Sequence, residues 1–509
     1  MKYYLSFLIG LVFTVNSVSA QELKFKVKGL PDTTVHLVKY VGSKLYFADT
    51  TQLKKGIATF DGSKHESGIM AFLLPGQQYF DFINNNEEVY IETSVPNFLD
   101  NLKVKESKEN QVFYNYIHFI KKNQEDNNVL IEKRNALDDD DTEAKEKLNN
   151  QIRATGERVK EFQKKLIAEK EGTFAAKVVK MSMDVEIPEP PKNEDGSLVD
   201  SSFSYKYVRD HYFDNFDWED DRILNTPVFQ KKLEYYYSKE MLLQQPDTVV
   251  KYLSRIIDQI PDKSNMYRFV VSNVASYAEK SNVMGMDKAF NIFISKYYCA
   301  PDSEGNPKAY WYDQDKLTEL CKDTKIRMNL VQGVRPPNLI LTDTTSNNWI
   351  DFYSLESDYT ILYFWDPNCG HCKKETPKLQ TLYEKKLKDR NVAVYAVGKA
   401  TGDDFEDWKK FIREKDLTFI NVGVTQEVYE KAKADPSAFQ GITNSESLNY
   451  QQTYDIFSTP KLWILDKDKK IIGKGLGISQ LEDYMDRIQG FTDAEKLIKK
   501  EEKKDKKSK

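Results

Sequence analysis

Apolar and polar residues alternate with a period of two along the first part of the chain. Residues 23–28 (Leu-Lys-Phe-Lys-Val-Lys) and 34–40 place an apolar side chain at every second position, which is typical of strands with one buried face. Glycine and Pro-Gly turns separate these runs at short intervals. The pattern predicts an N-terminal all-β domain over residues 21–105, built as a small antiparallel sandwich.

After residue 105 the apolar positions fall three or four residues apart, as on one face of a helix. Apolar side chains line residues 112–120, and the strongly charged segment 143–171 keeps the same spacing. This pattern predicts a middle, all-α helical domain over residues 106–330. Its further helices are expected at 248–260, 265–280, 286–298 and 316–330.

Between residues 334 and 490, short apolar runs alternate with amphipathic segments. Such alternation predicts an α/β domain whose sheet has a parallel core and an antiparallel edge. The segment 425–449 is long for a connection, and it is either part of a substrate-facing rim or a plain insertion. The expected order is strand 359–365, helix 369–388, strand 391–397, helix 405–415, strand 418–422, strand 461–466, strand 470–474 and helix 479–488.

Two cysteines, Cys369 and Cys372, stand where strand 359–365 leads into the next helix. At a helix start, free backbone N–H groups and the helix dipole stabilise a thiolate on the first cysteine. A thiolate with a second cysteine nearby can carry out thiol–disulfide exchange. A zinc site would need two more ligands, and no second C-x-x-C or histidine pair supplies them, so we expect no metal.

Residues around this pair follow the pattern of a known family. Trp365 lies four residues before the first cysteine, and Pro377 lies within the following helix. A Thr459-Pro460 pair precedes the expected strand hairpin. In these features residues 334–490 resemble TlpA/ResA-like thioredoxin-fold proteins, bacterial thiol-disulfide oxidoreductases that act outside the cytoplasm. The two preceding regions resemble β-rich and helical domains of unknown function found before such domains in gut-type bacterial proteins.

The resemblance extends to Glu375, which matches the glutamate of ResA-like active sites and shares a helix face with Cys372. A carboxylate there can hold or pass a proton, and the alternative interpretation is an ordinary first-turn glutamate favoured by the helix dipole. Tyr363 departs from the pattern, because thioredoxin itself has a buried aspartate at this position. We expect Cys369 to attack and Cys372 to resolve. The residues expected to contact the substrate are Trp365, His371, Thr459 and, through a cis peptide bond, Pro460.

The resemblance implies that the partners are protein thiols and disulfides. We expect no cofactor. It favours a reductase supplied by a membrane electron donor, whereas the Gly370-His371 dipeptide favours a more oxidising couple. The alternative function is a binding or assembly protein that uses the thioredoxin fold as a redox-gated platform. The intact cysteine pair favours the oxidoreductase, since a platform does not require both cysteines.

The first 20 residues are typical of a signal peptide, with Lys2, a short apolar stretch and a small-residue cleavage site at Val18-Ser19-Ala20. The apolar stretch of the leader is too short to span a membrane comfortably. We expect no membrane-spanning segment in the chain that remains after cleavage. The mature chain is expected to begin at Gln21 and to reside in the periplasm.

Cys299 and Cys321 are expected at the end of one helix and within the next. They form either a structural disulfide across a helical hairpin or two buried free thiols. A second redox couple is less favoured, because neither cysteine stands at a helix start.

The chain has 509 residues, 30% of them charged, and a net charge of −5. A chain of this length holds several domains, and its acidic balance argues against a nucleic-acid partner. Residues 491–509 form a lysine-rich tail, which we interpret from Lys496 onward as a frayed, solvated helix end.

Overall fold

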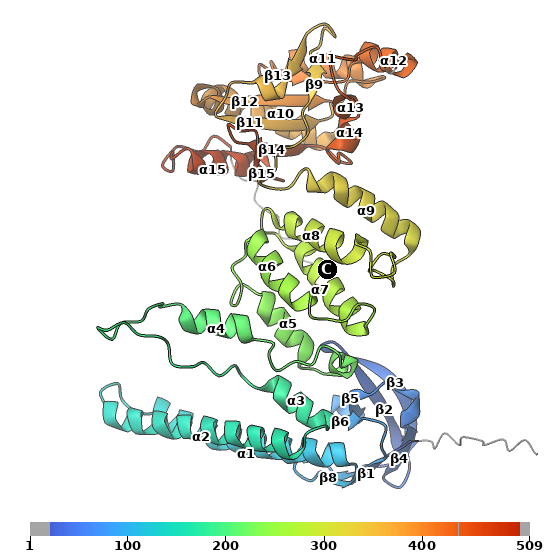
Figure 1. The fold of residues 1–509 in the computed structure, drawn as a ribbon, viewed down its shortest axis with the longest axis vertical. Coiled ribbons are helices and arrows are strands. Elements are labelled where there is room, and N and C mark those ends of the chain that lie inside the picture. The colour runs from blue at the N-terminus through green and yellow to red at the C-terminus, as the bar shows by residue number, and fades with distance from the viewer. Residues whose placement is uncertain (1–20, 436, 499–509) are drawn as a thin grey trace, which may run out of the picture. The chain divides into compact units, whose positions relative to one another are not determined.

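The computed structural model describes residues 21–435 and 437–498, so the predicted signal peptide and the end of the lysine-rich tail lie outside it (Figure 1). The described chain forms two compact units. The first contains the chain up to Leu242 together with Ser264–Met266, and the second contains Leu243–Lys263 and the chain from Tyr267 onward. In the described residues, no helix is both long and apolar enough to span a membrane.

The β-rich part of the first unit contains two four-stranded sheets, ordered β4-β1-β7-β8 and β3-β2-β5-β6. The strands are β1 (Glu22–Lys28), β2 (Thr33–Val41), β3 (Lys44–Leu53), β4 (Ile57–Asp61), β5 (Gly68–Leu73), β6 (Tyr79–Asn84), β7 (Val89–Ser94) and β8 (Lys103–Glu106). Strands β1 and β7 pair in parallel, so the prediction of a purely antiparallel sandwich is wrong at this pair. Alternation of apolar residues cannot distinguish parallel from antiparallel pairing, because a strand buries one face in either case.

Aromatic packing joins the two sheets into a sandwich, as the alternating pattern predicted. Phe25 of β1 stacks on Phe72 of β5, with ring centroids 4.4 Å apart. Phe82 of β6 meets the Phe25 ring edge-on at 5.0 Å. All three side chains are fully buried, so the sheets share one aromatic core.

Helices follow the sheets in the first unit, and the two longest lie side by side (Figure 1). The Phe119 ring of α1 stacks on Phe162 of α2 with centroids 3.7 Å apart. Glu109 accepts hydrogen bonds from the backbone N–H groups of Phe174 and Ala175, at 2.9 and 2.8 Å, and so caps the start of α3. The helices are α1 (Lys108–Asn135), α2 (Thr142–Glu169), α3 (Phe174–Ser182), α4 (Phe203–His211) and α5 (Phe229–Tyr237).

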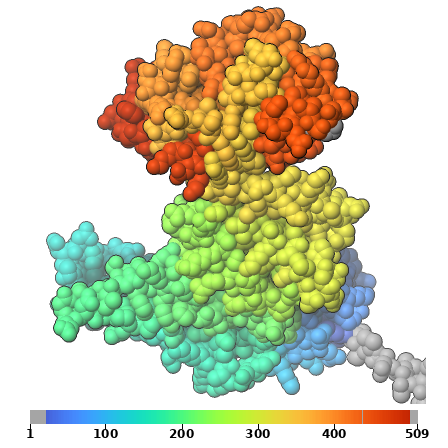
Figure 2. All heavy atoms as spheres, turned by 45° about the horizontal axis from the view of Figure 1, so that its top comes forward, coloured from blue at the N-terminus to red at the C-terminus, as the bar shows by residue number. Residues whose placement is uncertain are grey.

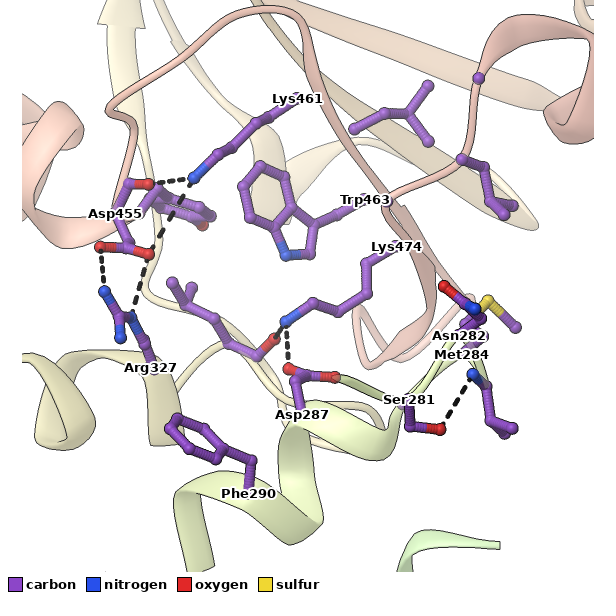
Figure 3. A pocket seen from close by; sticks show the side chains of 18 of the residues that line it. Ser281, Asn282, Met284, Asp287, Phe290, Arg327, Asp455, Lys461, Trp463 and Lys474 are labelled. Carbon is purple, nitrogen blue, oxygen red and sulfur yellow. Dashed lines mark hydrogen bonds and ion pairs between the residues drawn. The ribbon is translucent and has the colours of Figure 1, made fainter. Parts of the chain in front are cut away.

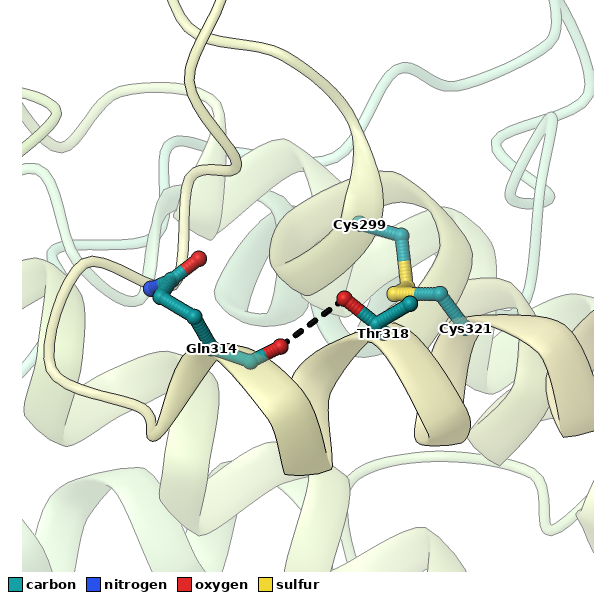
Figure 4. The surroundings of a disulfide bond; sticks show 4 residues. All are labelled: Cys299, Gln314, Thr318 and Cys321. Carbon is teal, nitrogen blue, oxygen red and sulfur yellow. Dashed lines mark hydrogen bonds between the residues drawn. A yellow bond between two sulfur atoms is a disulfide. The ribbon is translucent and has the colours of Figure 1, made fainter.

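The second unit begins with helices α6 (Pro246–Ile257), α7 (Asn265–Lys280), α8 (Met286–Ile294) and α9 (Gln314–Met328), although Asn265 and Met266 at the start of α7 group with the first unit. A π-helical turn, η4 (Ser295–Cys299), continues α8. A disulfide joins Cys299 of this turn to Cys321 of α9, with a Cα–Cα distance of 5.8 Å (Figure 4). Of the alternatives given in the sequence analysis, the structure therefore has the disulfide across the helical hairpin.

The C-terminal domain of the second unit is built on a five-stranded sheet of order β13-β12-β11-β14-β15. β11, β12 and β13 are parallel, whereas β14 and β15 form the antiparallel edge. In the space-filling view its orange and red side chains form one closely packed body (Figure 2). The strands are β11 (Tyr359–Trp365), β12 (Val392–Gly398), β13 (Ile420–Val422), β14 (Lys461–Leu465) and β15 (Ile471–Lys474).

Residues of β11 alternate between two apolar layers. Ile361, Tyr363 and Trp365 pack with helices on one face, whereas Leu362 and Phe364 pack with α12, α14 and the short strands β9 and β10 on the other. Both faces of this strand are therefore covered, which explains its continuous apolar run. The remaining elements are β9 (Ile340–Thr342), β10 (Trp349–Asp351), α10 (Gly370–Leu382), α11 (Asp404–Glu414), α12 (Gln426–Ala434), α13 (Ser445–Leu448), α14 (Tyr450–Thr453) and α15 (Ile478–Ile488).

The first part of the lysine-rich tail packs against this domain. Glu482 of α15 accepts hydrogen bonds from the backbone N–H groups of Leu497 and Ile498, at 2.8 and 2.9 Å. Lys496 forms an ion pair with Asp486 at 2.7 Å, and Ile498 is only 8% exposed. The prediction of a solvated helix end is therefore wrong as far as Ile498, because buried carboxylates of α15 provide partners that the charge pattern alone does not reveal.

Candidate active site

A tight turn carries the chain from β11 into α10 and positions the first cysteine. The Asp366 carboxylate accepts a hydrogen bond from the backbone N–H of Asn368 at 2.7 Å. The Asn368 amide donates to Asp404 at 2.8 Å and to Asp407 at 3.0 Å, which ties the turn to α11. Cys369 then occupies the N-cap of α10, and its side chain does not cap the helix. Its sulfur is therefore available at the positive end of the helix.

The two cysteines of this motif are free thiols with different exposure. Cys369 is partly exposed, whereas Cys372 is 0% exposed within the core. The Cys369 thiol donates a hydrogen bond to the backbone carbonyl of Thr459 at 3.3 Å. Thr459 precedes Pro460, and the peptide bond between them is cis. The fold thus brings the Thr-Pro loop against the first cysteine, although about 90 residues separate them in sequence.

The surroundings shift the two thiol pKa values in opposite directions. Partial burial raises the pKa of Cys369, but hydrogen bonds from the Cys372 backbone N–H and the Thr459 side chain outweigh it, so the pKa lies below its ordinary value. Burial raises the pKa of Cys372 to about 12. At neutral pH the exposed sulfur therefore has the greater thiolate fraction.

Tyr363 occupies the core behind the cysteines. It is 1% exposed, and its hydroxyl shares a hydrogen bond of 2.9 Å with the Thr376 hydroxyl of α10. Burial is the main cause that raises the tyrosine pKa well above its ordinary value, and the nearby cysteines add to the shift. This side chain is therefore neutral at physiological pH, and it provides no buried carboxylate at the position.

Glu375 lies one turn after Cys372, as its spacing predicted. Its carboxylate accepts a hydrogen bond from Lys378 Nζ at 2.6 Å, and the two side chains form an ion pair within α10. The carboxylate is half-buried, with 23% of the side chain exposed. A role of Glu375 in proton transfer stays a prediction.

The structure separates the residues predicted to contact substrate into two groups. His371 is exposed beside the cysteines, and Thr459 and Pro460 are partly exposed. Trp365, by contrast, is 1% exposed and packs against Phe411 of α11 with ring centroids 5.2 Å apart. The Trp365 side chain is thus part of the core of the domain, and its predicted contact with substrate stays a prediction.

Phe457 lies two residues before Thr459 and is 80% exposed, and the sequence analysis did not single it out. In the described residues, no group of three or more histidine, cysteine or acidic side chains is arranged to hold a metal ion.

Comparison with known proteins assigns the regions of the chain. Residues 333–473 match the AhpC/TSA family. The C-terminal domain is therefore an AhpC/TSA-family domain with a thioredoxin fold. Residues 143–308 and 22–113 match two domains of unknown function, DUF5106 and DUF4369. The multidomain order of strands, helices and a thioredoxin-like domain is confirmed.

Curated relatives of the AhpC/TSA domain are thiol-disulfide oxidoreductases. ResA of Bacillus cereus is 28% identical over 160 residues, which cover 31% of this chain and 78% of the relative. ResA of Bacillus thuringiensis is 26% identical over the same shares. The predicted class, a ResA-like thiol-disulfide oxidoreductase, is confirmed at the level of family and enzyme type.

Solved structures of similar proteins align with about a third of the chain. One is a domain of a possible thiol-disulfide isomerase from Cytophaga hutchinsonii, with 34% identity, a TM-score of 0.25 and coverage of 32% of this chain and 97% of that one. Another is the thioredoxin domain of a thiol-disulfide oxidoreductase from Bacteroides vulgatus, with 23% identity, a TM-score of 0.25 and coverage of 32% and 98%.

Proposed function

We propose that this protein exchanges disulfides with other proteins through Cys369 and Cys372, and that it acts as a reductase outside the cytoplasm. The observation that supports it most is the placement of the two sulfurs. Cys369 is partly exposed at the start of α10, and Cys372 lies buried behind it. Thiol–disulfide exchange needs one attacking thiolate with access to a partner and one resolving thiol without such access.

The exchange proceeds in two substitutions at sulfur. The Cys369 thiolate attacks one sulfur of the partner disulfide, forming a mixed disulfide and releasing the other partner sulfur as a thiolate that takes a proton. Cys372 then loses its proton and attacks the Cys369 sulfur, which releases the second partner thiol. The partner gains two electrons and two protons, and the Cys369–Cys372 pair is left oxidised.

The second step needs a base, because burial raises the pKa of Cys372 to about 12. We assign Glu375 to this proton transfer, since it lies one turn away on the same helix. Lys378 Nζ lies 2.6 Å from Glu375 Oε1, and this ion pair keeps the carboxylate oriented. Glu375→Gln should slow the resolution of a mixed disulfide and alter its pH dependence, whereas attack by Cys369 should continue. Equal resolution rates at every pH would assign the residue to helix stability only.

Turnover as a reductase requires a dithiol donor for the oxidised pair. Outside the cytoplasm such a donor is supplied across the membrane, so we include a membrane electron donor among the partners. The predicted signal peptide at residues 1–20 supports this location. N-terminal sequencing of secreted protein should find Gln21 as the first residue, and retention of the leader would contradict it.

Trapping of the mixed disulfide tests the proposed function. Cys372→Ser should accumulate partner proteins joined to Cys369, which non-reducing electrophoresis and mass spectrometry would identify. Cys369→Ser is the matched control and should form no such adduct. Adducts through Cys372 alone would reverse the two roles, and adducts in neither variant would favour a redox-gated binding platform. A measured reduction potential would decide between reductase and oxidase.

A further inference from the structure

A cavity of about 740 Å³ lies within the second unit, between the α7–α8 region and the thioredoxin-like domain. Met284, Asp287 and Phe290 contribute to its helical side. On the other side lie residues of the loop and strands next to the redox site, and Figure 3 shows Trp463 across from Phe290. The size suits a large side chain together with its adjoining backbone.

Four charged side chains in the wall form two ion pairs. Lys474 Nζ lies 2.6 Å from Asp287 Oδ2 and donates to the Leu330 carbonyl at 2.8 Å. Arg327 Nε lies 3.1 Å from Asp455 Oδ2 (Figure 3). Since these charges already compensate one another, the wall favours a neutral occupant over an ion.

Two buried polar atoms of the wall are left without a partner. Trp463 is 4% exposed and Asn291 is 1% exposed. Within the described part of the chain, neither the Trp463 indole N–H nor the Asn291 side-chain oxygen has a hydrogen-bond partner. Figure 3 shows the indole nitrogen on the side that faces Asp287 and Phe290. One free donor and one free acceptor match the carbonyl and N–H of a peptide backbone.

The cavity adjoins the attacking cysteine. Pro460 lines it and follows Thr459, whose carbonyl accepts the hydrogen bond from Cys369 at 3.3 Å. Glu375, one turn after Cys372, also lines it. A polypeptide joined to Cys369 can therefore continue into the cavity.

We propose that this cavity binds a large apolar side chain of the redox partner, within a few residues of the partner's reactive cysteine. The adjoining peptide group receives a hydrogen bond from Trp463 and donates one to Asn291. This inference rests on the proposed function and gives it a basis for substrate choice. The α7–α8 side of the cavity lies in the region that matches DUF5106, so that domain acts in partner recognition.

Synthetic peptides with one cysteine test the proposal. Each cysteine carries thionitrobenzoate in a mixed disulfide, and attack by Cys369 joins the peptide to the protein and releases the coloured thiolate. One series has phenylalanine two to six residues from the cysteine on either side, and the matched series has serine. With the reduced full-length protein, at least one phenylalanine position should react about tenfold faster than its serine counterpart, because burial of an aromatic side chain is worth that much or more.

Gly477 offers a matched pair of variants for the cavity wall. A Cβ atom added there would meet only the Gln480 side-chain oxygen at 3.7 Å, and the residue lines the cavity. Gly477→Phe should abolish the preference for phenylalanine by filling the space, whereas Gly477→Ala should keep it. Phe290→Ser, on the opposite wall, should also reduce the preference. The rate with each peptide is divided by the rate of the same variant with the dye disulfide alone, which is the thionitrobenzoate disulfide without a peptide. A misfolded variant is recognised because it loses the reaction with the peptide and the reaction with the dye disulfide.

Each outcome decides between the two proposals. Equal rates for both peptide series, with normal dye reaction, would overturn the cavity proposal and leave the proposed function intact. A preference that survives Gly477→Phe would also overturn it. Failure of the wild-type protein to react even with the dye disulfide would overturn both. If sedimentation shows a dimer that Gly477→Phe dissociates, the occupant is a second copy of this chain and the proposal is wrong.

Discussion

The two cysteine pairs of this protein consist of the same residues but differ in their place in the fold and in whether they are bonded. Cys299 and Cys321 are 22 residues apart on two helical elements, and they are joined by a disulfide (Figure 4). Cys369 and Cys372 are three residues apart at one helix start, and both are free. A bond between separate elements restrains the chain, whereas a pair at a helix start can open and close with little change of fold.

The local backbone makes the difference. Cys299 ends a π-helical turn and Cys321 lies inside α9, so neither faces the free N–H groups of a helix start. Cys369 does face them, and these donors lower its pKa. The first pair is therefore expected to be structural and the second to be reactive.

The largest expected difference concerns activity. Cys369→Ser should abolish exchange with a protein disulfide such as insulin, because it removes the attacking sulfur. Cys299→Ser with Cys321→Ser should retain it, since that pair takes no part in the reaction. Turnover of insulin by the two purified variants measures the effect. Loss of exchange in the Cys299/Cys321 variant, with normal folding, would make that pair a redox partner of the first.

A second test compares thiols within the reactive pair. The Cys369 pKa lies below its ordinary value and burial raises the Cys372 pKa to about 12, so Cys369 has the larger thiolate fraction at neutral pH. Iodoacetamide should therefore label Cys369 first. Its rate should rise with pH and level off below the pH expected for a free cysteine, about 8.5. Labelling followed by peptide mass spectrometry over a pH series would check this, and earlier labelling of Cys372 would contradict it.

The third test concerns stability. Loss of the Cys299–Cys321 bond should lower the free energy of unfolding by about 3 kcal/mol, because a cross-link over 22 residues restricts the unfolded chain. Replacing Cys369 by serine should change stability far less, since that residue is partly exposed. Denaturant unfolding of both variants measures the difference. An equal effect in the two would show that the first bond does not stabilise the fold.

The smallest expected effect is on the redox potential. His371 is exposed beside Cys369, and a positive charge there stabilises the thiolate and hence the reduced pair. His371→Pro should make the couple more reducing by about 30 mV, which corresponds to about 1.4 kcal/mol. Equilibration with glutathione buffers measures the potential. An unchanged or higher potential would show that the histidine does not tune the couple.

Local sequence patterns were sufficient for elements whose type and bounds follow from their own run of residues. The apolar run of β11 predicted Tyr359–Trp365, and α7 was predicted at its observed bounds, Asn265–Lys280. Patterns failed where the partner is remote in sequence. The parallel pairing of β1 with β7 and the packing of Ile498 near α15 both depend on residues that no local period identifies.

By itself, the sequence determined the order of the β-rich, helical and α/β regions and placed a cysteine pair at a helix start, because periodicity and helix-end chemistry act over a few residues. Only the tertiary structure decided that Trp365 is core and that the Thr459 carbonyl meets Cys369. It also decided that Trp463 and Asn291 border one cavity. Burial and long-range contact depend on how separate elements pack, and the same residue types fit a surface or a core until that packing is known.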